Sequence, residues 1–333
     1  MQDRIINGSV QDFIQWYDQD GDIINASDGG IFYEDGVYHW YGMALRALPD
    51  GRNGLSGGAS TVGVVMYASK DLYHWEKEGV ILSLSDDPQS PLYAPMRVER
   101  PKILRCPSTG KYVLWCHYTA YPGDQSDLLG KSEAGIAVSD TLQGPYTFLG
   151  CTRPIDDKGI VKDCTLFQDR DGAAYLVYDR KFTMENCCLH AVKLTDDYLG
   201  CSDTWARVNG ADQREAAAVM YHDGYYFMIT SGRTGWKFNQ AKYFRAQSML
   251  GPWEDMGDPC IGDDDHQTFH SQSSFAFALP GQPDQYIMML ERHNTQNFLH
   301  CSYIWLPVTF HSDHTLSLSY REEWEIQKVF QSV

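Results

Sequence analysis

The sequence lacks long apolar runs, a leader-like start and paired cysteines. No stretch approaches the roughly 18 apolar residues of a membrane-spanning helix, so we expect no membrane partner. Residues 1–18 show no basic segment followed by an apolar one, and we therefore expect no signal peptide and a cytoplasmic protein. The nine cysteines are scattered without metal-type spacing, which favours free, buried thiols.

Basic residues are also scarce. The chain has 27 Lys and Arg against 44 Asp and Glu, a net charge of −17, so phosphate backbones would be repelled and nucleic acid is excluded as a partner. A neutral sugar would not be repelled by this negative charge. The glycine-rich stretch 54–60 has no lysine, and neither dinucleotide nor Ser-His-Asp signatures occur, which excludes those enzyme classes.

What the sequence does have is a fivefold pattern. A polar residue, an apolar strand, a turn and an aromatic-rich strand recur in five phrases: SDGGIFYEDGVYHWYG, VERPKILRCPSTGKYVLWCHY, KDCTLFQDRDGAAYLVYD, REAAAVMYHDGYYFMITS and HSQSSFAFALPGQPDQYIMML. Asp-Gly between alternating runs predicts hairpins. With outer strands between the phrases, each unit has about four strands in roughly 50 to 70 residues, the size of a propeller blade. We predict an all-β, five-bladed β-propeller that forms a single domain over residues 1–333.

In a propeller the innermost strands converge on one channel, so the polar residue that begins each phrase should face its counterparts. These residues are Asp28, Glu99, Asp163, Glu215 and Gln272. Each one alone is as readily explained as a turn residue or a surface ion-pair partner. Their recurrence at the same phase favours a common site.

Several carboxyl groups around one channel suit glycosidic bond cleavage. That reaction needs one protonated and one ionised carboxyl, roughly 6.5–9.5 Å apart when the anomeric centre is inverted. Glu215 precedes the small apolar run AAAVMY, so burial should keep it neutral, and it is our candidate acid. Asp163 would orient Glu215 and hold its pKa up, and Asp28 would stay ionised and activate water.

These residues resemble glycoside hydrolase family 43, whose five-bladed members use an Asp of the first blade as base, an Asp of the third as modulator and a Glu of the fourth as acid. Asp28 stands three residues before Ile31-Phe32, KDCTLF carries Asp163, and REAAAVMY carries Glu215. The finer likeness, through phrases such as VERPKIL and HSQSSF, is to the exo-β-1,3-galactanase-like subfamily. That likeness implies an inverting, exo-acting hydrolase that removes a terminal, β-linked galactose from oligosaccharides or polysaccharide side chains. It also implies sugar contacts by Glu99 and Gln272.

Three departures from the subfamily bear on mechanism and substrate. Ser27-Asp28-Gly29 supplies a first-blade carboxylate that those galactanases lack, so we expect Asp28 to be the base in place of the glutamine proposed for them. The subfamily's glutamate after Trp-Tyr-Gly is Met43 here, and its Gly-Asp-Arg-Trp phrase is Leu290 to His293. These changes leave an α-L-arabinofuranosidase or a β-xylosidase open, and a non-catalytic sugar-binding propeller as well.

The remaining candidates are aromatic and metal-binding residues. Trp236 resembles the family's sugar-stacking tryptophan, with a place in the core between blades as the alternative, and Tyr121 and Asn186 match family contacts more loosely. The mechanism requires no cofactor. Because some members of the family hold a calcium ion in the channel, His270, in a stretch rich in Asp and His, keeps a structural calcium open.

Overall fold

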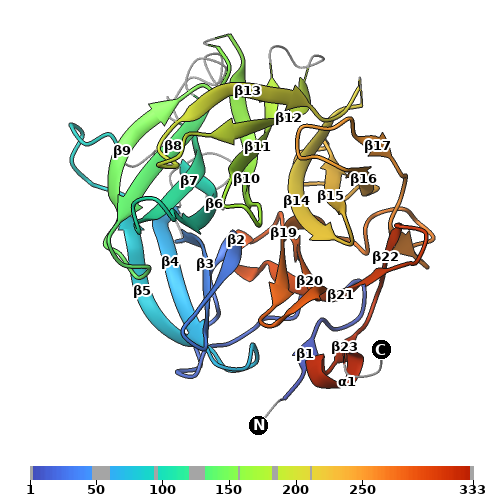
Figure 1. The fold of residues 1–333 in the computed structure, drawn as a ribbon. Helices are drawn as coiled ribbons and strands as arrows, with labels where there is room; N and C mark the ends of the chain where they lie inside the picture. Colours follow the sequence, from blue (N-terminus) through green and yellow to red (C-terminus); the bar gives the residue numbers. More distant parts are fainter. Residues whose placement is uncertain are drawn as a thin grey trace.

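Five sheets stand around a common axis, each with its first strand innermost (Figure 1). The computed structural model describes residues 3–46, 61–93, 97–119, 132–156, 158–181, 187–210 and 212–330. The innermost strands contact one another in chain order, and the last contacts the first. They are β2 (Ser27–Glu34), β6 (Arg97–Arg105), β10 (Ile160–Gln168), β14 (Arg214–His222) and β19 (Gln272–Leu279). The predicted five-bladed β-propeller is therefore confirmed.

The other strands follow outward from each innermost strand. In blades one to four they are β3 (Val37–Leu45), β4 (Thr61–Ser69) and β5 (Glu76–Ser83); β7 (Tyr112–Thr119), β8 (Ser132–Ser139) and β9 (Thr147–Thr152); β11 (Ala174–Lys181), β12 (Cys187–Leu194) and β13 (Cys201–Arg207); β15 (Tyr225–Gly232), β16 (Lys242–Ala246) and β17 (Glu254–Asp255). Blade five has β20 (Gln282–Arg292), β21 (Ser302–Phe310), β22 (Leu316–Ser319) and, parallel to β22, β18 (Cys260–Ile261). Outside the blades lie β1 (Ile5–Ile6), β23 (Glu323–Trp324), the short 3-10 helix η3 (Phe298–His300) and the helix α1 (Ile326–Phe330).

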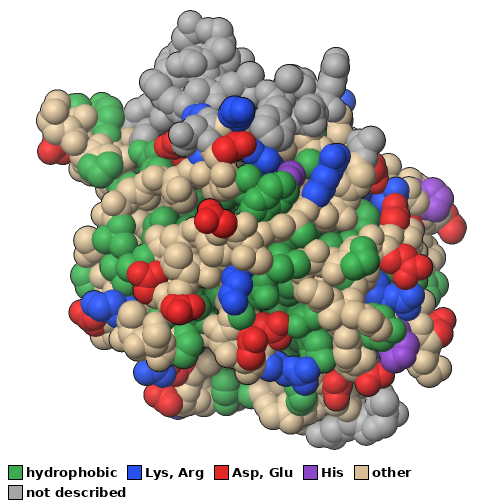
Figure 2. Space-filling view, turned by 45° about the horizontal axis from the view of Figure 1, so that its top comes forward, with side chains coloured by type: hydrophobic (Ala, Val, Ile, Leu, Met, Phe, Trp, Pro, Cys, Tyr) green, Lys and Arg blue, Asp and Glu red, His purple; other side chains and the backbone are tan. Residues whose placement is uncertain are grey.

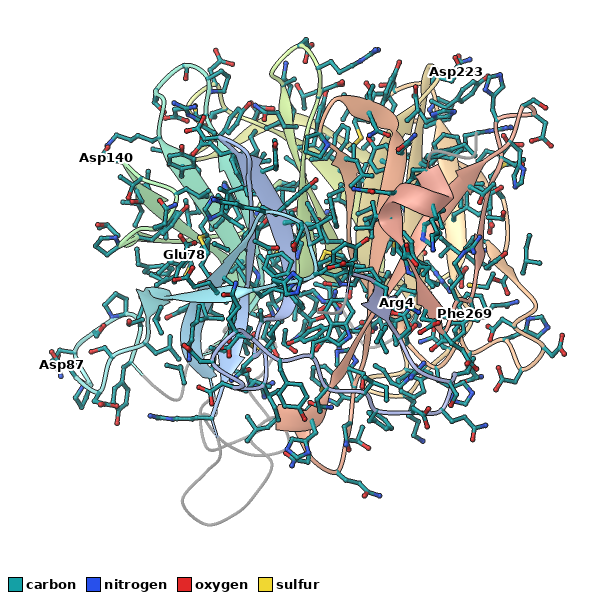
Figure 3. All side chains as sticks on the ribbon, turned by 90° about the horizontal axis from the view of Figure 1, so that it is seen from below. Arg4, Glu78, Asp87, Asp140, Asp223 and Phe269 are labelled. Carbon is teal, nitrogen blue, oxygen red and sulfur yellow. The ribbon has the colours of Figure 1, made fainter. Side chains whose placement is uncertain are left out.

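The Asp-Gly turns lie where the sequence predicts them. Asp35-Gly36 and Asp223-Gly224 have φ of 50° and 85°, and of 45° and 84°. Left-handed backbone at both central residues defines the tight hairpin turn that matches the twist of the flanking strands. Asp223 lies in the turn between β14 and β15, and Figure 3, which shows the ring from its side, labels it at the upper edge of the molecule.

A β-bulge interrupts every innermost strand at the same place. The pairing with the second strand shifts between Ser27 and Gly30, Glu99 and Lys102, Val161 and Cys164, Glu215 and Ala218, and Ser273 and Phe275. A bulge bends its strand and re-aims a side chain. The five predicted polar residues do not share one position relative to these bulges: Asp28 and Asp163 lie within them, Glu99 and Glu215 directly precede them, and Gln272 lies two residues before the last one. The predicted common phase is therefore wrong in detail, although all five residues lie at the start of an innermost strand.

The hydrophobic core lies between blades. Each of five large clusters joins two neighbouring blades, from blades one and five around Trp40 and Trp305 to blades three and four around Val177 and Met228. All nine cysteines are free, and none is exposed. Among the described residues, no helix is long and apolar enough to cross a membrane. Acidic and basic side chains are scattered over the face seen in Figure 2.

Candidate active site

Arg100 links two of the predicted catalytic carboxylates. Its Nε lies 2.8 Å from Asp163 Oδ2, and its Nη2 lies 3.3 Å from Asp28 Oδ1. Burial raises the pKa of Asp28, but the charge of Arg100, with that of His293, outweighs burial and holds this pKa well below its usual range. Asp28 is therefore an ionised carboxylate at neutral pH.

Glu215 shows the opposite behaviour. Burial, followed by the charges of Asp163 and Asp179, raises the pKa of Glu215 to about 8, although the charges of Arg233 and Arg100 act against it. Its Oε2 accepts a hydrogen bond from Arg233 Nε at 3.3 Å. Two carboxyl groups whose surroundings push their pKa values apart can divide acid and base roles between them. At neutral pH the site thus combines a protonated Glu215 with an ionised Asp28.

Gln272 connects Glu215 to the same network. Its Nε2 donates to Glu215 Oε1 at 3.2 Å, and its Oε1 accepts from Arg100 Nη2 at 2.8 Å. The structure therefore brings Asp28, Asp163, Glu215 and Gln272 together through Arg100.

Glu99 is buried in a separate ion-pair group. It lies 3.1 Å from Arg97 Nη1 and 3.2 Å from His117 Nδ1, its cross-strand partner. Its predicted contact with a sugar stays a prediction.

Trp236 lies beside this network, on the side of Asp28. Its ring centroid is 4.9 Å from that of His293, whose Nε2 is 3.8 Å from Asp28 Oδ1. The half-buried indole also packs against a small apolar cluster that contains Met43. Tyr121 and Asn186 lie outside the described residues.

The comparisons with known proteins decide the family. The sequence profile of glycosyl hydrolases family 43 matches residues 55–316, well over half of the chain. The chain belongs to glycosyl hydrolases family 43. Glycosidase chemistry on a β-propeller follows from that membership and agrees with the paired carboxyl groups. No curated protein sequence matches the chain.

Several solved structures of family 43 proteins superpose on the chain. A β-1,3-galactosidase is 29% identical, with a TM-score of 0.86, and the match covers 100% of this chain and 65% of the other. A second, bound to galactodeoxynojirimycin, is 30% identical, with a TM-score of 0.85 and coverage of 96% and 100%. An exo-β-1,3-galactanase from Clostridium thermocellum is 31% identical, with a TM-score of 0.81 and coverage of 97% and 67%. The resemblance to the galactanase-like subfamily is confirmed.

Sequence reasoning missed the residues that surround the carboxylates: Arg100, Asp179, Arg233, Glu291 and His293. The sequence does contain a pattern that points to three of them, Asp179, Glu291 and His293. The second strand of each blade runs antiparallel to the first, so its last residues lie beside the start of the innermost strand. Charged residues at the end of a long apolar run could therefore have been searched for site residues: YLVYDRK contains Asp179, and MMLERH contains Glu291 and His293.

The acidic and histidine groups here do not fit a calcium ion. Ligand atoms of Asp28, Glu291 and His293 all lie within 4.8 Å of one another, the one such group among the described residues. However, Glu291 already accepts from the hydroxyl of Ser27 and the backbone N–H of Asp28, and the Arg100 guanidinium lies 3.3 Å from Asp28 Oδ1. Hard cations need oxygen ligands free of competing positive charge. His270 is paired with Asp265 at 2.6 Å and takes no part in the group.

Proposed function

We propose that the protein is an inverting, exo-acting glycosidase that removes a terminal β-linked galactose from galactan-type oligosaccharides. The observation that carries this proposal is that Arg100 and Gln272 join Asp28, Asp163 and Glu215 in one network, whose surroundings lower the pKa of Asp28 and raise that of Glu215. The names of the three structural relatives, all acting on β-1,3-linked galactose, support the choice of sugar. A neutral oligosaccharide also suits a chain with a net charge of −17.

In this mechanism Glu215 donates its proton to the glycosidic oxygen as that bond breaks. Asp28 takes a proton from the water that attacks the anomeric carbon from the opposite face. Asp163 raises the pKa of Glu215 by like-charge repulsion and so keeps the acid protonated. Trp236 offers an aromatic face for the terminal sugar.

Glu215→Gln tests the acid. We expect turnover of β-1,3-galactobiose to be lost while the fold is retained, because an amide cannot donate the proton to the leaving oxygen. Glu254→Gln, an exposed change in the same blade, is the matched control. If the Glu215→Gln enzyme still hydrolyses β-1,3-galactobiose, whose leaving group is poor, Glu215 is not the acid.

A panel of aryl glycosides tests the sugar, and proton NMR of the first product tests the stereochemistry. We expect hydrolysis of the β-galactoside with α-galactose released first. Activity confined to α-L-arabinofuranosides or β-xylosides would replace the galactosidase assignment. Tight sugar binding in calorimetry without hydrolysis of any substrate would instead show a non-catalytic binding protein.

A further inference from the structure

The side-chain amide of Gln272 is held by two groups whose chemistry fixes its orientation. Arg100 Nη2 lies 2.8 Å from one end, and a guanidinium can only donate hydrogen bonds. At the other end, Ser231 Oγ gives its hydrogen to the Gly232 carbonyl at 2.8 Å and so accepts from Gln272 at 2.8 Å. The amide oxygen therefore faces Arg100, and the NH2 group faces Ser231.

This orientation leaves Gln272 one remaining hydrogen, which faces Glu215 Oε1 at 3.2 Å. Both amide hydrogens are then engaged, and the amide oxygen is polarised by a buried cation. An amide held in this way is a hydrogen-bond donor to the acid and a poor acceptor for a proton from water.

The side chain of Arg100 is buried and held by several partners. It is 3% exposed, and besides Asp28, Asp163 and Gln272 its Nη1 donates to the Ser273 carbonyl at 3.1 Å. Its φ of 50° lies in the left-handed region, within the bulge of β6. Such backbone strain persists only where the surroundings enforce it, and it concentrates at functional sites.

We propose that Arg100 is the positioning residue of this site, because its guanidinium holds Asp28, Asp163 and the amide oxygen of Gln272 together and thereby turns Gln272 into a hydrogen-bond donor to Glu215. Gln272 is then not the base. The proposal rests on the proposed function for its reaction, but the geometry that it describes can be tested separately.

Arg100→Lys is the first test. Lysine keeps the charge but lacks the planar guanidinium that bonds several partners at once. Asp28 and Asp163 should therefore be slightly misplaced, and we expect kcat on an aryl β-galactoside to fall about a hundredfold. Arg105→Lys, at the exposed end of the same strand, should leave kcat unchanged. An Arg100→Lys enzyme with wild-type kcat would overturn the proposal.

A charge-removing variant separates positioning from a purely structural role. Arg100 lowers the pKa of both Asp28 and Glu215. In Arg100→Gln both limbs of the pH profile should therefore move to higher pH, measured with β-1,3-galactobiose, whose leaving group needs the proton of Glu215. Limbs that stay in place would contradict the proposal.

Azide rescue decides which residue is the base. Azide should restore turnover to Asp28→Asn, as a glycosyl azide of inverted configuration, and should leave Gln272→Ala unrescued. Rescue of Gln272→Ala with none for Asp28→Asn would make Gln272 the base and overturn the proposal.

A neutron structure of the wild type provides a readout without turnover. Hydrogens on the end of Gln272 that faces Glu215 would support the proposal, and hydrogens on the end that faces Arg100 would overturn it. If the orientation holds while the wild type hydrolyses no glycoside of the panel, the proposed function fails and the positioning role of Arg100 stands.

Discussion

Asp163 lies close to both the Arg100 cation and the proposed acid Glu215. Its carboxylate pairs with Arg100 at 2.8 Å. Burial and then the negative charge of Asp163 raise the pKa of Glu215. The sequence indicated this modulating role from like-charge repulsion alone. Arg100 was not predicted, because an arginine next to a proline in an expected strand is usually interpreted as a surface residue.

The pH dependence of kcat/KM should follow Glu215. Because the active form has this acid protonated, activity should fall as pH rises through about 8. Asp163→Asn removes a repelling charge, so the pKa of Glu215 should drop and the basic limb should move to lower pH. Asp171→Asn, in the exposed turn of the same blade, is the control. A basic limb that is the same in wild type and Asp163→Asn would contradict this role.

At the scale of the element, the bulge decides where a side chain points. Without bulges, the period of two along a strand would send the residue after Ser27 to the wrong face. Gly29 permits the bulge of β2, because an added Cβ would lie 1.6 Å from the Tyr41 carbonyl oxygen. The Asp-Gly turns could be predicted from local sequence, but the bulges depend on how two strands pair.

Gly29→Ala should therefore move Asp28. We expect kcat/KM to fall at least about a hundredfold, since the clash is with backbone that cannot turn away. Gly224→Ala, at the hairpin turn of blade four, should lower the free energy of unfolding by about 1 kcal/mol and leave kcat unchanged. Steady-state kinetics and urea unfolding distinguish the two variants. Wild-type kinetics in Gly29→Ala would show that the bulge does not set the base.

At the scale of the whole molecule, the ring closes where the two ends of the chain meet. β1 pairs with β23, and Figure 1 shows both beside α1. Arg4, labelled in Figure 3, lies on this N-terminal segment and pairs with Glu323 at 2.8 Å. The side chain of Asn7 bonds both the N–H and the C=O of Trp305, and so extends the edge of blade five.

Asn7→Ala should destabilise the closed ring. Asn7 is fully buried, and its loss leaves the Trp305 N–H without its partner, so the free energy of unfolding should fall by about 1–3 kcal/mol. Urea unfolding followed by tryptophan fluorescence measures this change. Gln296→Ala, an exposed change, is the control, and equal stabilities of the two variants would show that Asn7 does not hold the ring closed.

The sequence by itself determined the five repeats, the hairpin turns and the recurring polar residue in each innermost strand. These features follow from local rules: the alternation of apolar residues, the left-handed preference of Asp-Gly, and the number of repeats. For the same reason the sequence identified Asp28, Asp163 and Glu215 as one set.

Only the tertiary structure decided which charges surround that set and in which protonation state it rests. Arg100 lies in β6 of the second blade and Asp179 in β11 of the third, whereas Arg233 directly follows β15 of the fourth. The pKa values of Glu215 and Asp28 depend on burial and on distances between those strands, because electrostatic energy varies with separation and surroundings in space and not with position along the chain.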